Sequence, residues 1–258
     1  MPDQPVLYDL TDGIATITLN RPEVMNALSA SLRRDLLAAL GRAQAEARVM
    51  VLTGAGRAFC SGQDLQDAGQ IGSFDLERIL NDEYVPMIKA ITDSPIPTIA
   101  AVNGAAAGAG ANLALAADIV IATESASFIQ AFTRIGLVPD AGGSYWLPRQ
   151  IGMARAMGAM LLGDRISAVQ AAEWGMIYEA VPDAGFAERV RARAVQLAAG
   201  PSVAYRGVKA MLRASFGNDL DAQLALEARL QGACGQTQDF REGVAAFLEK
   251  RAARFTGS

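Results

Sequence analysis

The sequence predicts an α/β protein, and three observations support that prediction. Short runs of apolar, β-branched residues recur along most of the chain. Segments with the helical spacing of apolar residues lie between those runs. After about residue 197 the runs stop, and only helical patterns follow. Alternation of strands and helices is typical of sheets that are covered by helices.

Four strands are expected. Residues 13–20 alternate between apolar and polar side chains, which is typical of a strand with one buried face. Residues 49–54, 97–104 and 118–123 are almost continuously apolar and are bounded by Gly, Asp or Thr. Strands of that kind are covered on both faces, as the strands of parallel sheets usually are.

Two helices are expected between these strands. Residues 29–40 place leucines on one stripe, and Ser29 or Ser31 is suited to cap the first turn. Arg33 and Arg34 are expected to lie on the solvated face of this helix. Residues 111–118 form a short, fully apolar segment, which suits a helix only in a buried position.

The end of the chain reads as three successive helices, over residues 201–216, 219–233 and 239–255. Gly200–Pro201 is the natural junction before them. We therefore divide the chain into a core, residues 1–197, and a C-terminal helical region, residues 198–258. The last helix has an apolar stripe, so this region must cover either its own core or another subunit.

Composition excludes several classes of function. The 258 residues include no histidine and two cysteines, and Lys+Arg 23 against Asp+Glu 27 leave a net charge of −4. Without histidine there can be no Ser-His-Asp or Cys-His nucleophile system and no imidazole metal site, so other groups must transfer protons. A mildly acidic chain without a basic block argues against nucleic-acid binding.

The cysteines, the N-terminal residues and the apolar segments indicate where in the cell the protein is expected. Cys60 and Cys234 form neither a disulfide framework nor a zinc cluster, which indicates a reducing compartment. The acidic N-terminal residues show no secretory signal. Residues 101–122 are interrupted by Gly and Asn, so we interpret them as core and not as a membrane span. We expect a cytoplasmic protein without membrane contact, in which Cys60 is a small buried side chain.

Two glycine-containing loops each follow an expected strand, over residues 53–65 and 103–115. Small residues let backbone N–H groups approach a ligand, and a helix N-terminus favours negative charge. Two such N–H groups that converge on one carbonyl oxygen form an oxyanion hole. The alternative is that the glycines only permit close packing, and either loop alone does not decide between the two. Neither loop completes a dinucleotide fingerprint, a phosphate loop or a Gly-x-Ser-x-Gly elbow.

Together, the blocks around these loops resemble the crotonase family of enoyl-CoA hydratases and isomerases, in the family's order and over almost the whole chain. The matching blocks are NRPEVMNAL (20–28), VLTGAGRAFCSGQDL (51–65), AVNGAAAGAGANLALAADIVIA (101–122), GLVPDAGGSYWLPR (136–149), ARAMGAMLLG (154–163), AAEWGMI (171–177) and FREGVAAFLEKR (240–251).

The resemblance implies a fold and a class of substrate. The fold is a crotonase-like spiral of ββα turns, followed by C-terminal helices that assemble a homotrimer, often paired into a hexamer. The substrate is an acyl-CoA thioester, so CoA belongs to the substrate, and no separate cofactor or metal is expected. Whether the chain also docks to a partner enoyl-CoA hydratase is left open.

Carried over by position, the resemblance assigns the two oxyanion donors to the N–H groups of Gln63 and Ala109. The carbonyl of Ser61 would meet the adenine ring of CoA, and Phe247 and Lys250 would approach CoA from a neighbouring subunit. The other residues expected near CoA are Val24, Gly62, Asp64 and Leu65. For Asp64, a role in tying down its own loop is favoured over direct contact with substrate.

One acidic side chain remains at a catalytic position of the family, Asp140 in the stretch IGLVPDAGG. The two glutamates with which family hydratases add water correspond to Asn112 and Phe132, so hydration by that route is not expected. A single base can move a proton between two carbons, which is isomerisation, and an apolar pocket would raise its pKa. The residues alone also permit Asp140 to cap the following helix; the resemblance favours the base.

Within the family, the blocks are most similar to bacterial isomerases of phenylacetate degradation, which convert ring-1,2-epoxyphenylacetyl-CoA to the seven-membered oxepin-CoA. A related activity moves a 3-enoyl double bond to the trans-2 position. The resemblance implies that Asp140 removes a proton alpha to the thioester while the Gln63 and Ala109 amides hold the enolate oxygen. The alternatives are a general enoyl-CoA isomerase or hydratase of fatty-acid oxidation and a non-catalytic acyl-CoA-binding subunit.

Overall fold

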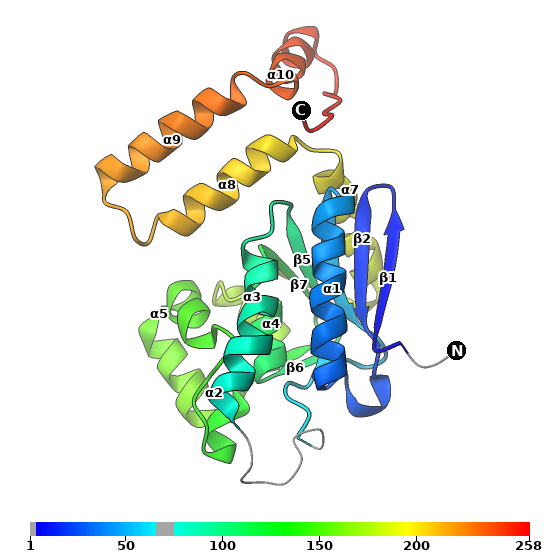
Figure 1. Ribbon diagram of the computed structural model, residues 1–258, viewed down its shortest axis with the longest axis vertical. Coiled ribbons are helices and arrows are strands. Elements are labelled where there is room, and N and C mark those ends of the chain that lie inside the picture. The colour runs from blue at the N-terminus through cyan, green and yellow to red at the C-terminus, as the bar shows by residue number, and fades with distance from the viewer. Residues whose placement is uncertain (1–3, 66–74) are drawn as a thin grey trace.

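Two sheets form the centre of the protein in the computed structural model, which describes residues 4–65 and 75–258 (Figure 1). The larger sheet contains β1 (Val6–Thr11), β2 (Ile14–Leu19), β3 (Val49–Gly54), β5 (Thr98–Val102), β7 (Ile119–Thr123) and β10 (Glu179–Val181), in that order. The smaller sheet contains β4 (Ala58–Cys60), β6 (Ala105–Ala107), β8 (Ser127–Ile129) and β9 (Arg165–Ser167).

The connections between the sheets form a spiral. The chain passes from β3 to β4, from β5 to β6 and from β7 to β8, so each turn adds one strand to each sheet before a helix. Strands β2, β3, β5, β7 and β10 pair in parallel, and only β1 in that sheet is antiparallel to its neighbour. The four expected strands are therefore present, and the predicted ββα spiral is confirmed.

Ten α-helices surround or extend the sheets within the described residues. They are α1 (Ala30–Glu46), α2 (Leu76–Ile79), α3 (Val85–Thr92), α4 (Ala109–Leu115), α5 (Gly143–Leu162), α6 (Ala168–Glu173), α7 (Phe186–Ala198), α8 (Ser202–Ala214), α9 (Leu220–Cys234) and α10 (Gln238–Glu249). A π-helical turn, Leu80–Tyr84, joins α2 to α3. The shorter 3-10 helices are Pro22–Val24, Ala131–Ile135 and Asp183–Gly185. The Oγ atom of Ser29 accepts the N–H of Leu32, as expected for the cap of α1.

The packing of strand β3 explains why its sequence is almost continuously apolar. Met50 and Leu52 belong to the main core, which also contains Leu36 of α1, whereas Val49 and Val51 belong to a second core beneath α7. Both faces of the strand are therefore buried, in agreement with the prediction from its sequence.

The C-terminal helices α8 and α9 extend away from the two sheets (Figure 1). The proposed boundary between residues 197 and 198 falls at the end of α7. Arg48 lies beside this boundary, and its guanidinium donates to the carbonyl of Gly200 at 2.7 Å and to that of Thr256 at 2.7 Å. Arg213 of α8 forms an ion pair with Asp118 at 2.9 Å. These contacts attach the helical region to the core.

Candidate active site

The two glycine loops lie against each other. Gly62 follows β4 and has a φ of +93°, and a Cβ at this position would lie 2.8 Å from the carbonyl oxygen of Ala107 in the second loop. Gly110, in the second loop, packs equally closely against the first loop. A Cβ at Gly110 would lie 2.4 Å from the carbonyl oxygen of Cys60. Both positions therefore require glycine for the loops to approach this closely.

The backbone geometry leaves the two candidate oxyanion donors free to meet a ligand. Leu28 donates its N–H to the carbonyl of Gly62 and accepts the N–H of Asp64, so the N–H of Gln63 between them points away from Leu28. Ala109 is the first residue of α4, where an N–H has no partner within the helix. Gln63 and Ala109 thus present N–H groups from adjoining loops.

The side chain of Gln63 is held by a polar network that the sequence did not reveal. Its Oε1 atom accepts a hydrogen bond from the hydroxyl of Tyr84 and another, at 3.1 Å, from the Nη1 atom of Arg33. Arg33 also donates to the carbonyl of Leu28 at 2.6 Å and pairs with Glu83 at 2.7 Å. These contacts join the loop of Gln63 to α1 and to the π-helical turn.

Arg33 corrects one prediction. Its side chain is 4% exposed, whereas we expected it on the solvated face of α1. A signal was present in the sequence, because Arg33 lies three residues before Leu36 and seven before Leu40, on the same stripe of the helix. Arg34, with its side chain 73% exposed, is solvated as expected.

Asp140 lies in a sharp turn before α5. The next two residues, Ala141 and Gly142, have φ values of +47° and +83°. Gly142 is the N-cap of α5, and no side chain caps this helix, so the interpretation of Asp140 as a helix cap is wrong. The Oδ1 atom of Asp140 is buried and has no hydrogen-bond partner. Removal from water raises the pKa of this carboxyl to about 6.

Two contacts bring Asp140 to the loops. The Nδ2 atom of Asn112, in α4, donates to the backbone carbonyl of Asp140 at 2.8 Å. Tyr84, whose hydroxyl donates to Gln63, lies near Asp140: burial raises the pKa of Tyr84, the Arg33 guanidinium opposes this increase, and the negative charge of Asp140 adds to it. The turn of Asp140 therefore lies against α4, which begins at Ala109, and near Tyr84, which contacts Gln63.

The two positions that correspond by resemblance to the hydratase glutamates also lie beside the start of α4. Asn112 is fully buried. Phe132 is 6% exposed, and its ring lies 3.7 Å from where a Cβ of Gly108 would be. An amide and an aromatic ring therefore occupy these positions, and neither can accept a proton from water at neutral pH.

The expected CoA contacts divide into two groups. Ser61 and Val24 lie together, because the Oγ atom of Ser61 donates to the carbonyl of Val24 at 3.3 Å. Asp64 is 8% exposed and pairs with Arg21 at 2.7 Å, which fits a role in holding its own loop. Leu65 is 63% exposed.

Phe247 and Lys250 form the second group. Phe247, in α10, is 82% exposed, and Lys250 is the C-cap of the same helix. Helix α10 lies at the opposite end of the molecule from β6 and α2, so a single chain does not bring these two residues to the loops (Figure 1). Their predicted contact with CoA therefore requires a neighbouring copy.

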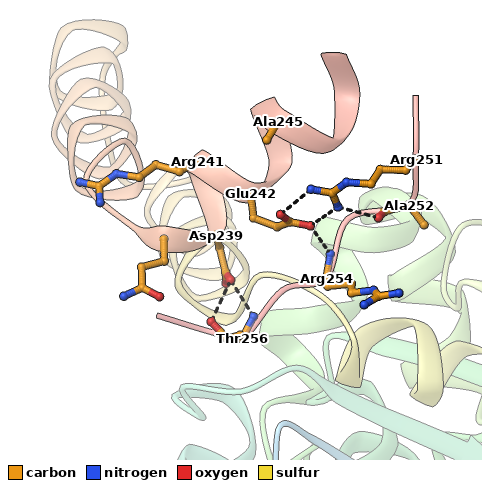
Figure 2. Close-up of a pocket in the computed structure, with 9 residues that line it drawn as sticks. Asp239, Arg241, Glu242, Ala245, Arg251, Ala252, Arg254 and Thr256 are labelled. Carbon is orange, nitrogen blue, oxygen red and sulfur yellow. Dashed lines mark hydrogen bonds and ion pairs between the residues drawn. The ribbon is translucent and has the colours of Figure 1, made fainter. Parts of the chain in front are cut away.

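A separate open cavity of about 820 Å³ lies beside α10 (Figure 2). Its walls are tied together internally: Glu242 accepts from Arg251 at 2.6 Å and from the backbone N–H of Arg254 at 2.8 Å, and Asp239 accepts from the N–H of Thr256 at 2.7 Å. The residues predicted to bind an acyl thioester do not line it. It is distinct from the candidate active site.

Cys60 lies just before the loop of Gln63, and its surroundings disfavour a nucleophilic thiolate. Burial raises the pKa of its thiol to about 12, and its Sγ donates to the carbonyl of Asn26 at 3.2 Å. Residues 4–65 and 75–258 bring together no group of three or more Cys, Asp or Glu side chains that could hold a metal ion. In the same part of the chain, no helix has both the length and the apolar character needed to cross a membrane.

Comparison with known proteins identifies relatives along almost the whole chain. The family model for enoyl-CoA hydratase/isomerase matches residues 9–258. A "probable enoyl-CoA hydratase" of Rhodobacter capsulatus is 62% identical over 252 residues, covering 98% of each protein. A 1,2-epoxyphenylacetyl-CoA isomerase of Escherichia coli is 44% identical over 257 residues, covering 98% of each.

Solved structures of enoyl-CoA hydratases are also similar to this chain over almost its whole length. The crystal structure of an enoyl-CoA hydratase from Bacillus anthracis is similar with a TM-score of 0.94 and 34% identity, covering 99% of this chain and 100% of that one. An enoyl-CoA hydratase from Mycobacterium smegmatis is similar with a TM-score of 0.91 and 30% identity, covering 97% and 98%.

Proposed function

Because the chain belongs to the enoyl-CoA hydratase/isomerase family, we propose that it isomerises acyl-CoA thioesters. Asp140 is the base, and the N–H groups of Gln63 and Ala109 hold the oxygen of the enolate. The proposed substrate is ring-1,2-epoxyphenylacetyl-CoA, which becomes oxepin-CoA, and the same site shifts 3-enoyl-CoA to trans-2-enoyl-CoA. The observation that carries this proposal is the Asp140 carboxyl, which has a buried, unpaired oxygen and a pKa raised to about 6.

The same base serves both reactions. Asp140 removes a proton from the carbon next to the thioester carbonyl, and the negative charge that moves to the carbonyl oxygen is held by the two amides. In a 3-enoyl thioester, the double bond moves to the 2-position and protonated Asp140 returns the proton to the γ-carbon. In the epoxide, the bond shared by the two epoxide carbons opens, the ring expands, and the proton is returned to a ring carbon. Neither reaction gains or loses an atom.

The acyl group is proposed from similarity to the isomerase of Escherichia coli. The broader reaction class is supported by the chain itself, because Asn112 and Phe132 stand at the positions of the two hydratase glutamates and, among the described residues, Asp140 supplies the carboxyl at the family's third catalytic position. Hydration of 2-enoyl-CoA is the second candidate, since the 62% identical relative is named a probable hydratase. Addition of water needs a group to take a proton from water and a group to protonate the carbon, and Asp140 would have to do both.

We also propose that the active unit is a homotrimer, or a hexamer of two trimers. Phe240, Val244, Phe247 and Leu248 of α10 are between 44% and 82% exposed. An apolar surface of this kind is typical of a face that another copy covers. In such an assembly, Phe247 and Lys250 of one copy would contact the CoA bound to the next.

A panel of three thioesters tests the function. Purified protein is incubated with ring-1,2-epoxyphenylacetyl-CoA, a 3-enoyl-CoA and a 2-enoyl-CoA, and absorbance of the conjugated thioester is followed. The proposal expects oxepin-CoA from the epoxide and a rise in absorbance from the 3-enoyl-CoA. Loss of absorbance from the 2-enoyl-CoA, with no reaction of the other two, would instead identify a hydratase. Tight binding of all three without turnover would identify a non-catalytic subunit.

A further inference from the structure

Asn112 makes two side-chain hydrogen bonds in the core of the candidate site. It is the fourth residue of α4 and is fully buried. Its Nδ2 atom donates to the backbone carbonyl of Asp140 at 2.8 Å, and its Oδ1 atom accepts from the Nε2 atom of Gln130 at 2.8 Å. The bond from Gln130, which is itself 1% exposed, orients the amide so that its N–H₂ group faces Asp140.

Asp140 depends on its backbone for its position. Its side-chain Oδ1 atom has no hydrogen-bond partner, and the carboxyl interacts with the backbone of Asp140 itself, so the place of the carboxyl follows the place of the turn. The carbonyl of Asp140 accepts two hydrogen bonds, one from Asn112 and one from the N–H of Gly143 at 2.9 Å. The second closes the turn locally, whereas the first ties the turn to another element.

The packing around Asn112 is tight. A Cβ at Gly143 would lie 2.4 Å from the Nδ2 atom of Asn112, so the first residue of α5 can be this close only as glycine. The same helix α4 begins at Ala109, one of the two candidate oxyanion donors. A single short, buried helix therefore presents the N–H at its start and holds the turn of the base from its middle.

We propose that Asn112, oriented by Gln130, is a positioning residue that fixes Asp140 relative to the oxyanion hole. This inference rests on the proposed function, since it assigns a role to the position that corresponds to a glutamate in hydratases. An amide here does not transfer protons. It holds the one carboxyl that does, at a fixed place relative to the amide of Ala109.

The test compares Asn112→Ala with the native enzyme on the 3-enoyl-CoA. A small displacement of a reacting group can lower a rate about 100-fold, so we expect kcat to fall by about 10- to 100-fold. KM should stay within about threefold, because the CoA contacts are elsewhere. The low-pH limb of kcat/KM, expected near pH 6, should move to lower pH as the carboxyl gains access to water. Tyr84, the ionisable neighbour, has a pKa raised further above its usual value and does not produce this limb.

A double-mutant comparison separates positioning from general damage. Asn112→Ala is also made in an Asp140→Asn background, where a residue that acts through Asp140 should cause little further loss. Thr98→Val is the matched control: it removes a buried side-chain hydrogen bond to Asp118 at the start of β5, and it should lower stability without moving kcat or the pH limb.

Gln130→Met provides a second variant, should Asn112→Ala fail to fold. It removes the donor that orients Asn112 and also a buried oxygen that has no partner. We expect a several-fold lower kcat and no additional loss in the Asp140→Asn background. The inference is overturned if these variants keep native kcat and the native pH limb, or if they lower activity equally with and without Asp140. If Asp140→Asn itself remains active, the proposed function fails as well, which distinguishes the two failures.

Discussion

Replacement of Asp140 by Asn keeps the size of the side chain and removes its ability to accept a proton. The pKa of Asp140 is about 6, so at pH 7 the carboxyl is ionised in roughly ten of eleven molecules. It is also a stronger base than an aspartate in water, because its pKa is higher. A positioned base contributes about 10²–10⁴-fold in rate, or about 2.7–5.4 kcal/mol of the barrier. Asp140→Asn should therefore lower kcat at least about 100-fold.

Two assays measure this effect. Absorbance of the conjugated product gives kcat with a 3-enoyl-CoA, and exchange of the α-proton with solvent deuterium follows the first step separately. Asp219→Asn is the matched control, because Asp219 caps α9 by accepting the N–H of Ala222 and Asn caps equally well. A value of kcat for Asp140→Asn within a few-fold of the native enzyme, with the control unchanged, would remove Asp140 from the mechanism.

Stability gives an independent reading of the same substitution. The pKa of Asp140 is higher in the folded protein than its ordinary value of 3.8, so folding favours the protonated form. The free energy of unfolding therefore falls as pH rises from about 4 to about 6, and it stays lower above that range. The neutral Asn does not carry this cost. Asp140→Asn should unfold at a higher temperature than the native protein at pH 8, and the difference should disappear near pH 4. A lower unfolding temperature at pH 8 would contradict the proposed burial of the charge.

Three further predictions follow from the same geometry. The native kcat/KM should fall about tenfold per pH unit below pH about 6, because protonated Asp140 cannot remove a proton; a flat profile down to pH 5 would contradict this. Tyr84→Phe removes the hydroxyl that donates to Gln63, so the loop that carries the proposed oxyanion donor loses support. We expect kcat to fall about tenfold with little change in KM. Steady-state kinetics measure both, and an unchanged kcat would refute the role of the network. Phe247→Asp should convert the oligomer to monomers in size-exclusion chromatography, and a monomeric native protein would refute the proposed trimer.

The elements with the clearest sequence signals are those buried on both faces. Residues 49–54 and 118–123 are almost continuously apolar because the sheet has one core on each side, and the observed β3 and β7 lie within those ranges. The strands of the smaller sheet have three residues each, which is too short to show a period of two. Their pairing is decided by segments far apart in the chain, such as β4 with β6.

The residues of the candidate site also fall into two groups, those with a local sequence signal and those without one. The loops around Gln63 and Ala109 could be found from the sequence, because glycines at strand ends are a local signal. The contacts that hold the site are not local. Tyr84 reaches Gln63 across 21 positions, and Asn112 reaches Asp140 across 28. In each pair the two residues belong to different segments of the chain, so the fold is needed to show that these side chains meet.

The oxyanion hole and the base differ in how easily evolution can change them. The proposed donors are backbone N–H groups beside Gly62 and Gly110, which have no room for a side chain, so these loops cannot vary freely without loss of the proposed site. The carboxyls are side chains, and each can be replaced singly. A hydratase and an isomerase can therefore share the fold and most of the sequence, which agrees with one relative at 62% identity named a probable hydratase and another at 44% named an isomerase. Overall identity is a weak guide to the reaction for this reason. The more informative feature is which carboxyls lie at the catalytic positions of the family, and in the proposed mechanism the amide of Asn112 and the ring of Phe132 leave this role to Asp140.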